Sequence, residues 1–187
     1  MRVDAARFGR RRLLKIAGGA ALAAAGAVAL VRTSGYPAPP RRLASLSASQ
    51  YAVAQHAARR ITAPDRADSS IPTADDLDVA GFIDAWLPRM RAPVRRDFGR
   101  FLAFIEHLAP IQAGYAARFT RLDPADQDRV LQGIEASSSE LLRAGFDGLK
   151  SLCFMGYYRD PRAWAIAGYD GPLVGRPPEG WSAGGGP

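Results

Sequence analysis

Few side chains in this sequence are of the types that bind metals or act as nucleophiles. The chain has two histidines, His56 and His107, and one cysteine, Cys153, and the three are far apart in sequence. A zinc site uses about four ligands, usually in closely spaced pairs, and a c-type haem needs a Cys-x-x-Cys-His sequence. A Gly-x-Gly-x-x-Gly turn and a phosphate-binding loop are also missing. The sequence therefore predicts no metal site and no cofactor site in this chain.

The remaining candidates for catalysis have simpler interpretations. Cys153 falls on the apolar stripe of an expected helix, where a thiol behaves as a small inert side chain. Asp75, Asp76 and Asp78 cluster at an expected helix start, where carboxylates interact favourably with the helix dipole. No catalytic residue is predicted.

The first 35 residues instead resemble an export signal. Gly9 to Lys15 reads Gly-Arg-Arg-Arg-Leu-Leu-Lys, which fits the twin-arginine pattern of two arginines, any residue, two apolar residues and a lysine. An uncharged run rich in alanine and glycine follows, from Ile16 to Val31. A basic region before a weakly hydrophobic stretch is typical of such signals, which are kept apart from fold reasoning. The residues that the export machinery would recognise are Arg10, Arg11 and Lys15.

A membrane span is the alternative interpretation of this segment. The run from Ile16 to Val31 is shorter than the roughly 20 strongly apolar residues that a bilayer requires, so an export signal is favoured. Cleavage stays open, because one small-x-small candidate, Ala27-Val28-Ala29, lies inside the apolar run and the other, at 34–38, contains Tyr36 and Pro37. The predicted location is the periplasm, or the periplasmic face of the inner membrane if the segment stays as an anchor.

The positive charge belongs mainly to this leader. The whole chain carries +7, of which residues 1–35 contribute +6 from seven basic residues and one acid, so the rest carries +1. A nucleic-acid-binding domain needs clustered basic charge on its folded part. No nucleic-acid partner is predicted.

The domain organisation follows from composition. About 150 residues remain after the leader, beginning with a proline-rich linker at 36–46, and this length suits one domain with its own core. With a single cysteine, no internal disulfide framework exists. We expect a helical domain over 47–175 and a disordered tail over 176–187.

Apolar residues recur with helical spacing, and no long run alternates as a strand would. Ser47 with Gln50 has the spacing of a capping box, Pro88 should end a helix, and Asp123-Pro124 is a typical helix opening. The sequence predicts a small all-α domain of about five helices. Their expected ranges are 47–62, 73–87, 93–108, 123–134 and 138–155.

Helical periodicity stops after Met155, and the segment that follows is rich in aromatic residues and turns. Aromatic side chains with a polar handle are favoured at interfaces, but they also pack in cores. Both interpretations stay open: a partner interface, or a tail that covers the helical core. The candidate interface residues are Phe154, Tyr157, Tyr158, Trp164 and Tyr169.

Several segments of the mature region form a recognisable pattern: Phe82-Ile83-Asp84, Arg95 to Phe98, Phe119, Leu122-Asp123-Pro124, Lys150 to Tyr158 and Gly168 to Pro172. The closing Gly-Tyr-Tyr and Gly-Tyr-x-Gly-Pro sequences are its most specific part. Through these segments the mature region resembles the gluconate 2-dehydrogenase subunit 3 family, small gamma subunits of flavin-dependent glucose-methanol-choline dehydrogenases.

This resemblance implies a non-catalytic subunit that binds, stabilises and escorts a large flavoprotein dehydrogenase through twin-arginine export. The FAD would lie on that partner, which oxidises an alcohol or sugar and passes electrons to a cytochrome c subunit or membrane acceptor. In this setting Cys153 is a candidate for an intersubunit disulfide, with a buried free thiol as the alternative. Two other functions stay open: a stand-alone periplasmic or membrane-tethered helical protein, and an oxidoreductase in its own right.

Overall fold

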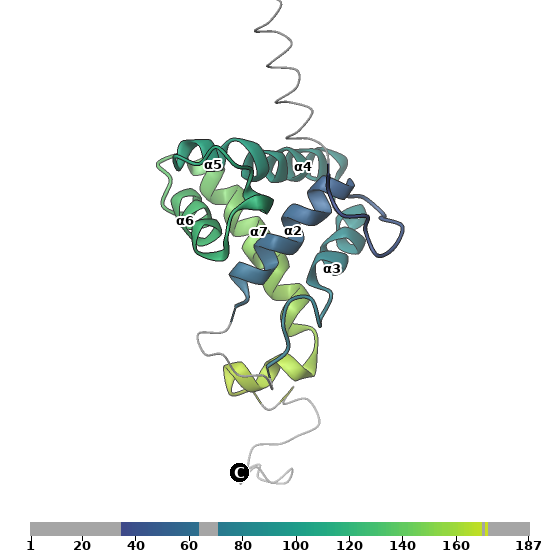
Figure 1. Ribbon diagram of the computed structural model, residues 1–187. Coiled ribbons are helices and arrows are strands. Elements are labelled where there is room, and N and C mark those ends of the chain that lie inside the picture. The colour runs from purple at the N-terminus through teal and green to yellow at the C-terminus, as the bar shows by residue number, and fades with distance from the viewer. Residues whose placement is uncertain (1–34, 64–70, 170, 172–187) are drawn as a thin grey trace, which may run out of the picture. The chain divides into compact units, whose positions relative to one another are not determined.

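A computed structural model describes residues 35–63, 71–169 and 171. Internal contacts divide the chain into two units, Met1–Ala38 and Pro39–Pro187, and every helix given below belongs to the second. The twin-arginine residues Arg10, Arg11 and Lys15 and the tail predicted at 176–187 lie outside the described residues. Within the described residues the fold is all-α, without strands, as predicted (Figure 1).

Helix α2 spans Ala48–Ile61 and contacts α3, α4, α6 and α7. Ser47 caps it: the Ser47 hydroxyl accepts a hydrogen bond from the Gln50 backbone N–H, and the Gln50 side chain accepts one from the Ser47 N–H. This confirms the predicted capping box. The helix can occupy the centre because its inward residues are mostly small, with Ala54 and Ala57 fully buried.

Helix α3 spans Val79–Trp86 and begins later than the sequence suggested. Thr73 and Asp76 exchange hydrogen bonds as in a capping box, but residues 74–78 form turns. Asp78 has a left-handed backbone (φ 48°) that a helix cannot include, so α3 starts after it. A short 3-10 turn, η1 (Leu87–Arg89), follows at Pro88, where the helix was predicted to end.

Three further predicted helices are present. Helix α4 spans Ala92–His107 with Pro93 in its first turn, and the four-residue α5 (Ala109–Gln112) follows. Helix α6 spans Pro124–Glu135 and is capped by Asp123, whose carboxylate accepts the Asp126 N–H at 2.9 Å. Helix α7 spans Glu140–Tyr158. Between α5 and α6, a 3-10 turn, η2 (Phe119–Arg121), inserts the fully buried Phe119 into the core.

The C-terminal end of α7 differs from the sequence prediction. The helix continues through Gly156 to Tyr158, and a 3-10 helix, η3 (Pro161–Ala167), follows. Tertiary contacts explain this extension, because Gly156 packs against Phe82 and the Tyr157 hydroxyl donates a 2.6 Å hydrogen bond to the Pro72 carbonyl. Partners on distant segments stabilise turns that lack an amphipathic pattern of their own.

The core forms where α2 and α7 cross, with α3 on one side and α6 on the other and α4 across one end (Figure 1). Its largest fully buried side chains include Ile83 from α3, Leu102 and Ile105 from α4, and Leu149 from α7. In the described part of the chain, no helix has both the length and the apolarity to cross a bilayer.

Candidate partner-binding site

The titratable residues considered for chemistry lie apart from one another. Among the described residues, no three or more of His, Cys, Asp and Glu gather where they could hold a metal ion. His56 is half-buried on α2, and its Nδ1 lies 2.9 Å from the Gln127 amide nitrogen. Burial, followed by the nearby Arg59 charge, lowers its pKa below 6.5, so the ring is neutral at pH 7. The contact between His56 and Gln127 joins α2 to α6, which is a structural role.

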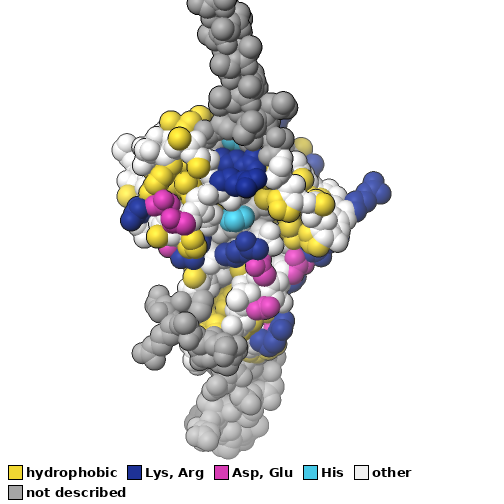
Figure 2. Space-filling view, viewed as in Figure 1, with side chains coloured by type: hydrophobic (Ala, Val, Ile, Leu, Met, Phe, Trp, Pro, Cys, Tyr) yellow, Lys and Arg dark blue, Asp and Glu magenta, His cyan; other side chains and the backbone are white. Residues whose placement is uncertain are grey.

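The basic residues on the α2 face are largely paired with acids. Arg59 donates to Asp75 at 2.7 Å, and Arg60 donates to both oxygens of Asp128 at 2.7 and 2.6 Å. Figure 2 shows lysine or arginine and histidine side chains along the middle of this face, with acidic side chains close by. Because both signs alternate, this face does not form the uniform basic patch that phosphate backbones require.

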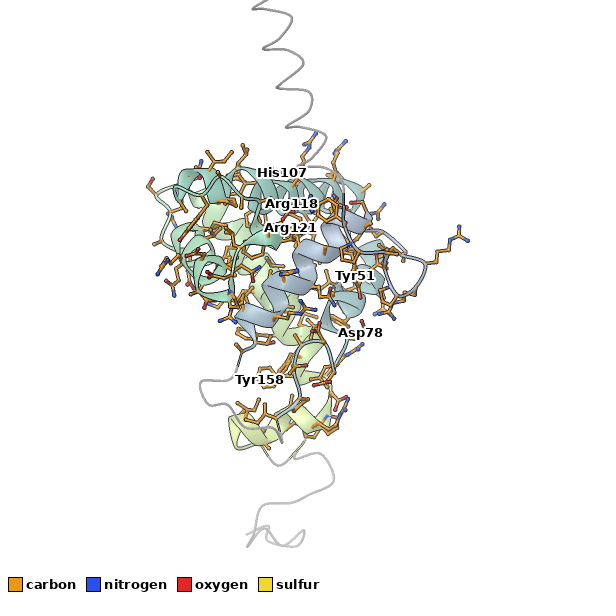
Figure 3. All side chains as sticks on the ribbon, in the orientation of Figure 1. Tyr51, Asp78, His107, Arg118, Arg121 and Tyr158 are labelled. Carbon is orange, nitrogen blue, oxygen red and sulfur yellow. The ribbon has the colours of Figure 1, made fainter. Side chains whose placement is uncertain are left out.

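A buried ion pair joins α4 to the segment before α6. Glu106 and Arg118 have side chains only 1% and 5% exposed, and the Arg118 Nε lies 3.4 Å from a Glu106 oxygen. The same carboxylate accepts hydrogen bonds from the Thr120 hydroxyl at 2.7 Å and from its N–H at 3.1 Å. Figure 3 labels Arg118 and Arg121 at η2, beside α4. Since a substrate cannot reach Glu106, this carboxylate serves to fix η2.

Asp84 has a similar role just before the start of α2. Its carboxylate, 3% exposed, accepts hydrogen bonds from three consecutive backbone N–H groups, those of Ala44, Ser45 and Leu46, at 2.7–2.9 Å. These contacts fasten the chain that enters the domain to α3. No role was predicted for Asp84 from the sequence, although it belongs to a segment that carries the family resemblance.

Replacing Asp84 by alanine is expected to destabilise the domain by about 3 kcal/mol, because three backbone donors lose a charged acceptor. Urea unfolding followed by circular dichroism measures this change. The matched control is Asp97→Ala: its partner is Arg100 on the same helix, both are well exposed, and the loss should stay below about 1 kcal/mol. Equal stability of the two variants would contradict the anchoring role.

Cys153 is fully buried in the described core, and its thiol has no disulfide partner within the chain. Burial raises the pKa of this thiol from 9.0 to about 12, so the nucleophilic thiolate is scarce at neutral pH. This placement favours the free-thiol alternative for the subunit on its own. The intersubunit disulfide stays a prediction, with the added condition that the sulfur must first become accessible to the partner.

In the isolated native subunit, Cys153 should react with Ellman's reagent at pH 8 at least about a hundredfold more slowly than in the urea-unfolded chain. The reason is that little of the thiol is ionised and that the reagent cannot reach the buried sulfur. Fast reaction in the native state would show that the sulfur is accessible.

Non-reducing electrophoresis of the complex tests the intersubunit disulfide. A band at the mass of the large subunit alone leaves the disulfide unsupported.

The aromatic residues predicted as a partner interface separate into two groups. Tyr157 is 1% exposed and packs in the core, which favours for this residue the interpretation that the segment covers the helical core. Phe154 is half-buried against Tyr158 (ring centroids 6.1 Å apart). Tyr158 and Tyr169 are 38% and 47% exposed. Neither tail interpretation holds for the whole set, because one residue packs inward and others face solvent.

The exposed members surround a hollow of about 260 Å³ beside η3. We refer to its lining residues, Tyr158, Trp164, Ala167 and Tyr169, as the C-terminal aromatic surface. Trp164 is held in place because its indole N–H donates to the Tyr158 carbonyl at 2.8 Å and its ring lies edge-on to Tyr169, 5.2 Å away. Figure 3 labels Tyr158 near η3. Fixed, amphipathic aromatic side chains are typical of protein interfaces.

Comparison with known proteins identifies the family. The family model described as gluconate 2-dehydrogenase subunit 3 matches residues 48–171, from the first residue of α2 past the end of η3. No curated protein and no solved structure gives a match. The matched region includes all the helices of the described residues. The chain therefore belongs to the gluconate 2-dehydrogenase subunit 3 family.

Proposed function

We propose that this chain is the non-catalytic small subunit of a flavin-dependent alcohol or sugar dehydrogenase. The family match is the observation that supports this most strongly, because the family is named as a subunit of a dehydrogenase. A subunit implies a partner chain, and a dehydrogenase partner needs a redox cofactor. We place the FAD on that partner, the large flavoprotein subunit.

The described surface is consistent with binding rather than catalysis. The conspicuous acids and the thiol, Glu106, Asp84 and Cys153, are buried and committed to structure. The C-terminal aromatic surface, in contrast, presents two exposed tyrosines, Tyr158 and Tyr169, and the half-buried Trp164, which are residue types that contribute most to protein interfaces. It is our candidate for one contact with the large subunit.

The second part of the proposal is export. The twin-arginine route carries folded proteins, so a flavoprotein that acquires its cofactor in the cytoplasm can cross only when bound to a chain that has the signal. Arg10, Arg11 and Lys15 provide that signal here. The complex would then work in the periplasm or at the periplasmic face of the inner membrane. A cytochrome c subunit would accept its electrons.

Affinity purification of the tagged full chain from its native host tests this proposal. We expect a large chain to co-purify, with the absorbance spectrum of oxidised flavin and dye-linked alcohol or sugar oxidation. A tagged chain recovered alone after detergent extraction would instead favour a stand-alone helical protein. A co-purified chain without flavin would contradict the proposal that the partner is a flavoprotein.

A further inference from the structure

A second apolar surface lies between α4 and α7, separate from the C-terminal aromatic surface. It is a groove of about 670 Å³, formed by one face of α4 and the first half of α7. We call it the α4–α7 groove and define it by Val94, Phe98, Phe101 and Phe104 from α4 and Leu141 and Gly148 from α7. Val94, Phe98 and Phe101 recur with helical spacing on α4, but the rest of the fold covers this apolar face only in part, since Val94 is exposed.

The apolar side chains at the lip of the groove are open to solvent. Leu141 is 80% exposed and Val94 is 50% exposed, whereas Phe101 forms the wall at 9%. Val94 and Leu141 stand beside three phenylalanines in one hollow and not singly on the surface, and contiguous apolar patches of this kind often have a binding function. Such a surface indicates that another molecule covers it.

Glycines on α7 keep the groove open. A Cβ at Gly145 would lie 2.8 Å from the Phe101 ring, so only glycine lets the ring pack flat against α7. At Gly148 an added Cβ would meet nothing within 4 Å. Gly148 is therefore not required by packing within this subunit, although glycine in a helix interior costs up to about 1 kcal/mol relative to alanine. The space above Gly148 is available to an incoming group.

The charges at the groove do not select a charged occupant. Asp97 and Arg100 both line it and pair with each other at 3.0 Å, so their charges largely cancel. Apolar walls with a neutralised rim fit apolar side chains on a helix or extended segment, as in helix-in-groove recognition. They do not fit nucleic acid or an anionic lipid headgroup.

We propose that the α4–α7 groove receives an apolar segment of the large dehydrogenase subunit, an inference that rests on the function proposed above. A second copy of this chain fits less well, since a two-fold dimer would place one groove against another. The leader run from Ile16 to Val31 is mostly alanine and glycine and lacks large side chains to fill a site walled by three phenylalanines. The family, by contrast, implies a partner that must cover part of this small domain.

The test fills the groove without disturbing the fold. Gly148→Trp places a large ring in open space, and Gly133→Trp is its matched control, because Gly133 lies on α6, outside the groove, and also has nothing within 4 Å of an added Cβ. Each full-length variant is tagged and co-expressed with the dehydrogenase subunit. We expect both to keep the melting temperature of the wild-type subunit. Gly148→Trp alone should lower the amount of co-purified dehydrogenase by about tenfold or more.

A second variant, which changes the groove at another position, separates loss of binding from local effects of the tryptophan at position 148. Leu141→Glu replaces an 80% exposed side chain in the first turn of α7, where an acid is compatible with the helix dipole. It should lower recovery of the dehydrogenase to a similar extent. If both groove variants co-purify as much dehydrogenase as wild type does, the proposal that the groove binds the dehydrogenase is overturned. The proposed function then stays intact, because the partner still binds. If neither wild type nor Gly133→Trp recovers a dehydrogenase, both proposals fall. Wild-type self-association that Gly148→Trp abolishes would assign the groove to a second copy.

Discussion

Replacing Arg10 and Arg11 together by lysine is expected to leave the dehydrogenase partner in the cytoplasm. Arginine presents a planar, bidentate guanidinium, and lysine keeps the charge but not this geometry, so the variant separates specific recognition from net charge. Dehydrogenase activity in the periplasmic fraction should fall to that of a strain without this chain, while cytoplasmic activity rises. Cell fractionation followed by a dye-linked activity assay measures both.

The matched control for export replaces Arg2 and Arg7, which lie outside the motif, by lysine. Export should continue, because the number of conservative changes is the same and the twin arginines remain. A partner that still reaches the periplasm with Arg10 and Arg11 replaced would contradict the escort role. It would leave the subunit assignment in place, since that depends on the family and not on the leader.

The largest effect on stability is expected from Glu106. Glu106→Ala leaves the 5% exposed Arg118 without its buried counter-charge and removes both acceptors of Thr120. Breaking a buried pair on one side costs about 3–5 kcal/mol. Because small domains have only about 5–15 kcal/mol of stability, the variant should be partly unfolded or melt far below wild type. Calorimetry and urea titration measure the change.

Two companion variants identify the cause of this loss. Glu135→Ala removes a carboxylate from an exposed pair with Lys150 and should cost less than about 1 kcal/mol. Combining Glu106→Gln with Arg118→Met removes both charges and should recover much of the lost stability. A Glu106→Ala protein as stable as Glu135→Ala would show that the buried pair does not fix η2.

Local sequence signals predicted the helical elements well. Ser47 with Gln50 and Asp123 with Pro124 define helix starts through contacts within three residues, and both caps are present. Signals of this kind are readable because the donor and acceptor are neighbours in sequence. The start of α3 was missed because it depends on the left-handed backbone of Asp78, whose side chain pairs with Arg41, 37 residues away.

The candidate site was harder to predict than the elements. Tyr157 and Tyr158 are adjacent and chemically alike, but a carbonyl 85 residues away selects Tyr157 for burial. In the same way, Val94 and Phe101 share one apolar stripe, and only the position of α7 decides that Phe101 is covered and Val94 is exposed. Periodicity identifies an apolar face but not which part of it the rest of the fold covers. That remainder is where partner surfaces are found.

We propose that this chain carries a dehydrogenase but holds no redox group itself. To test this, the full-length chain is purified without its partner, and its absorbance spectrum and its alcohol or sugar oxidation with an artificial electron acceptor are recorded. We expect a colourless, inactive protein, and flavin absorbance with turnover only once the large subunit is present. A chain that is coloured and oxidises an alcohol by itself would contradict it.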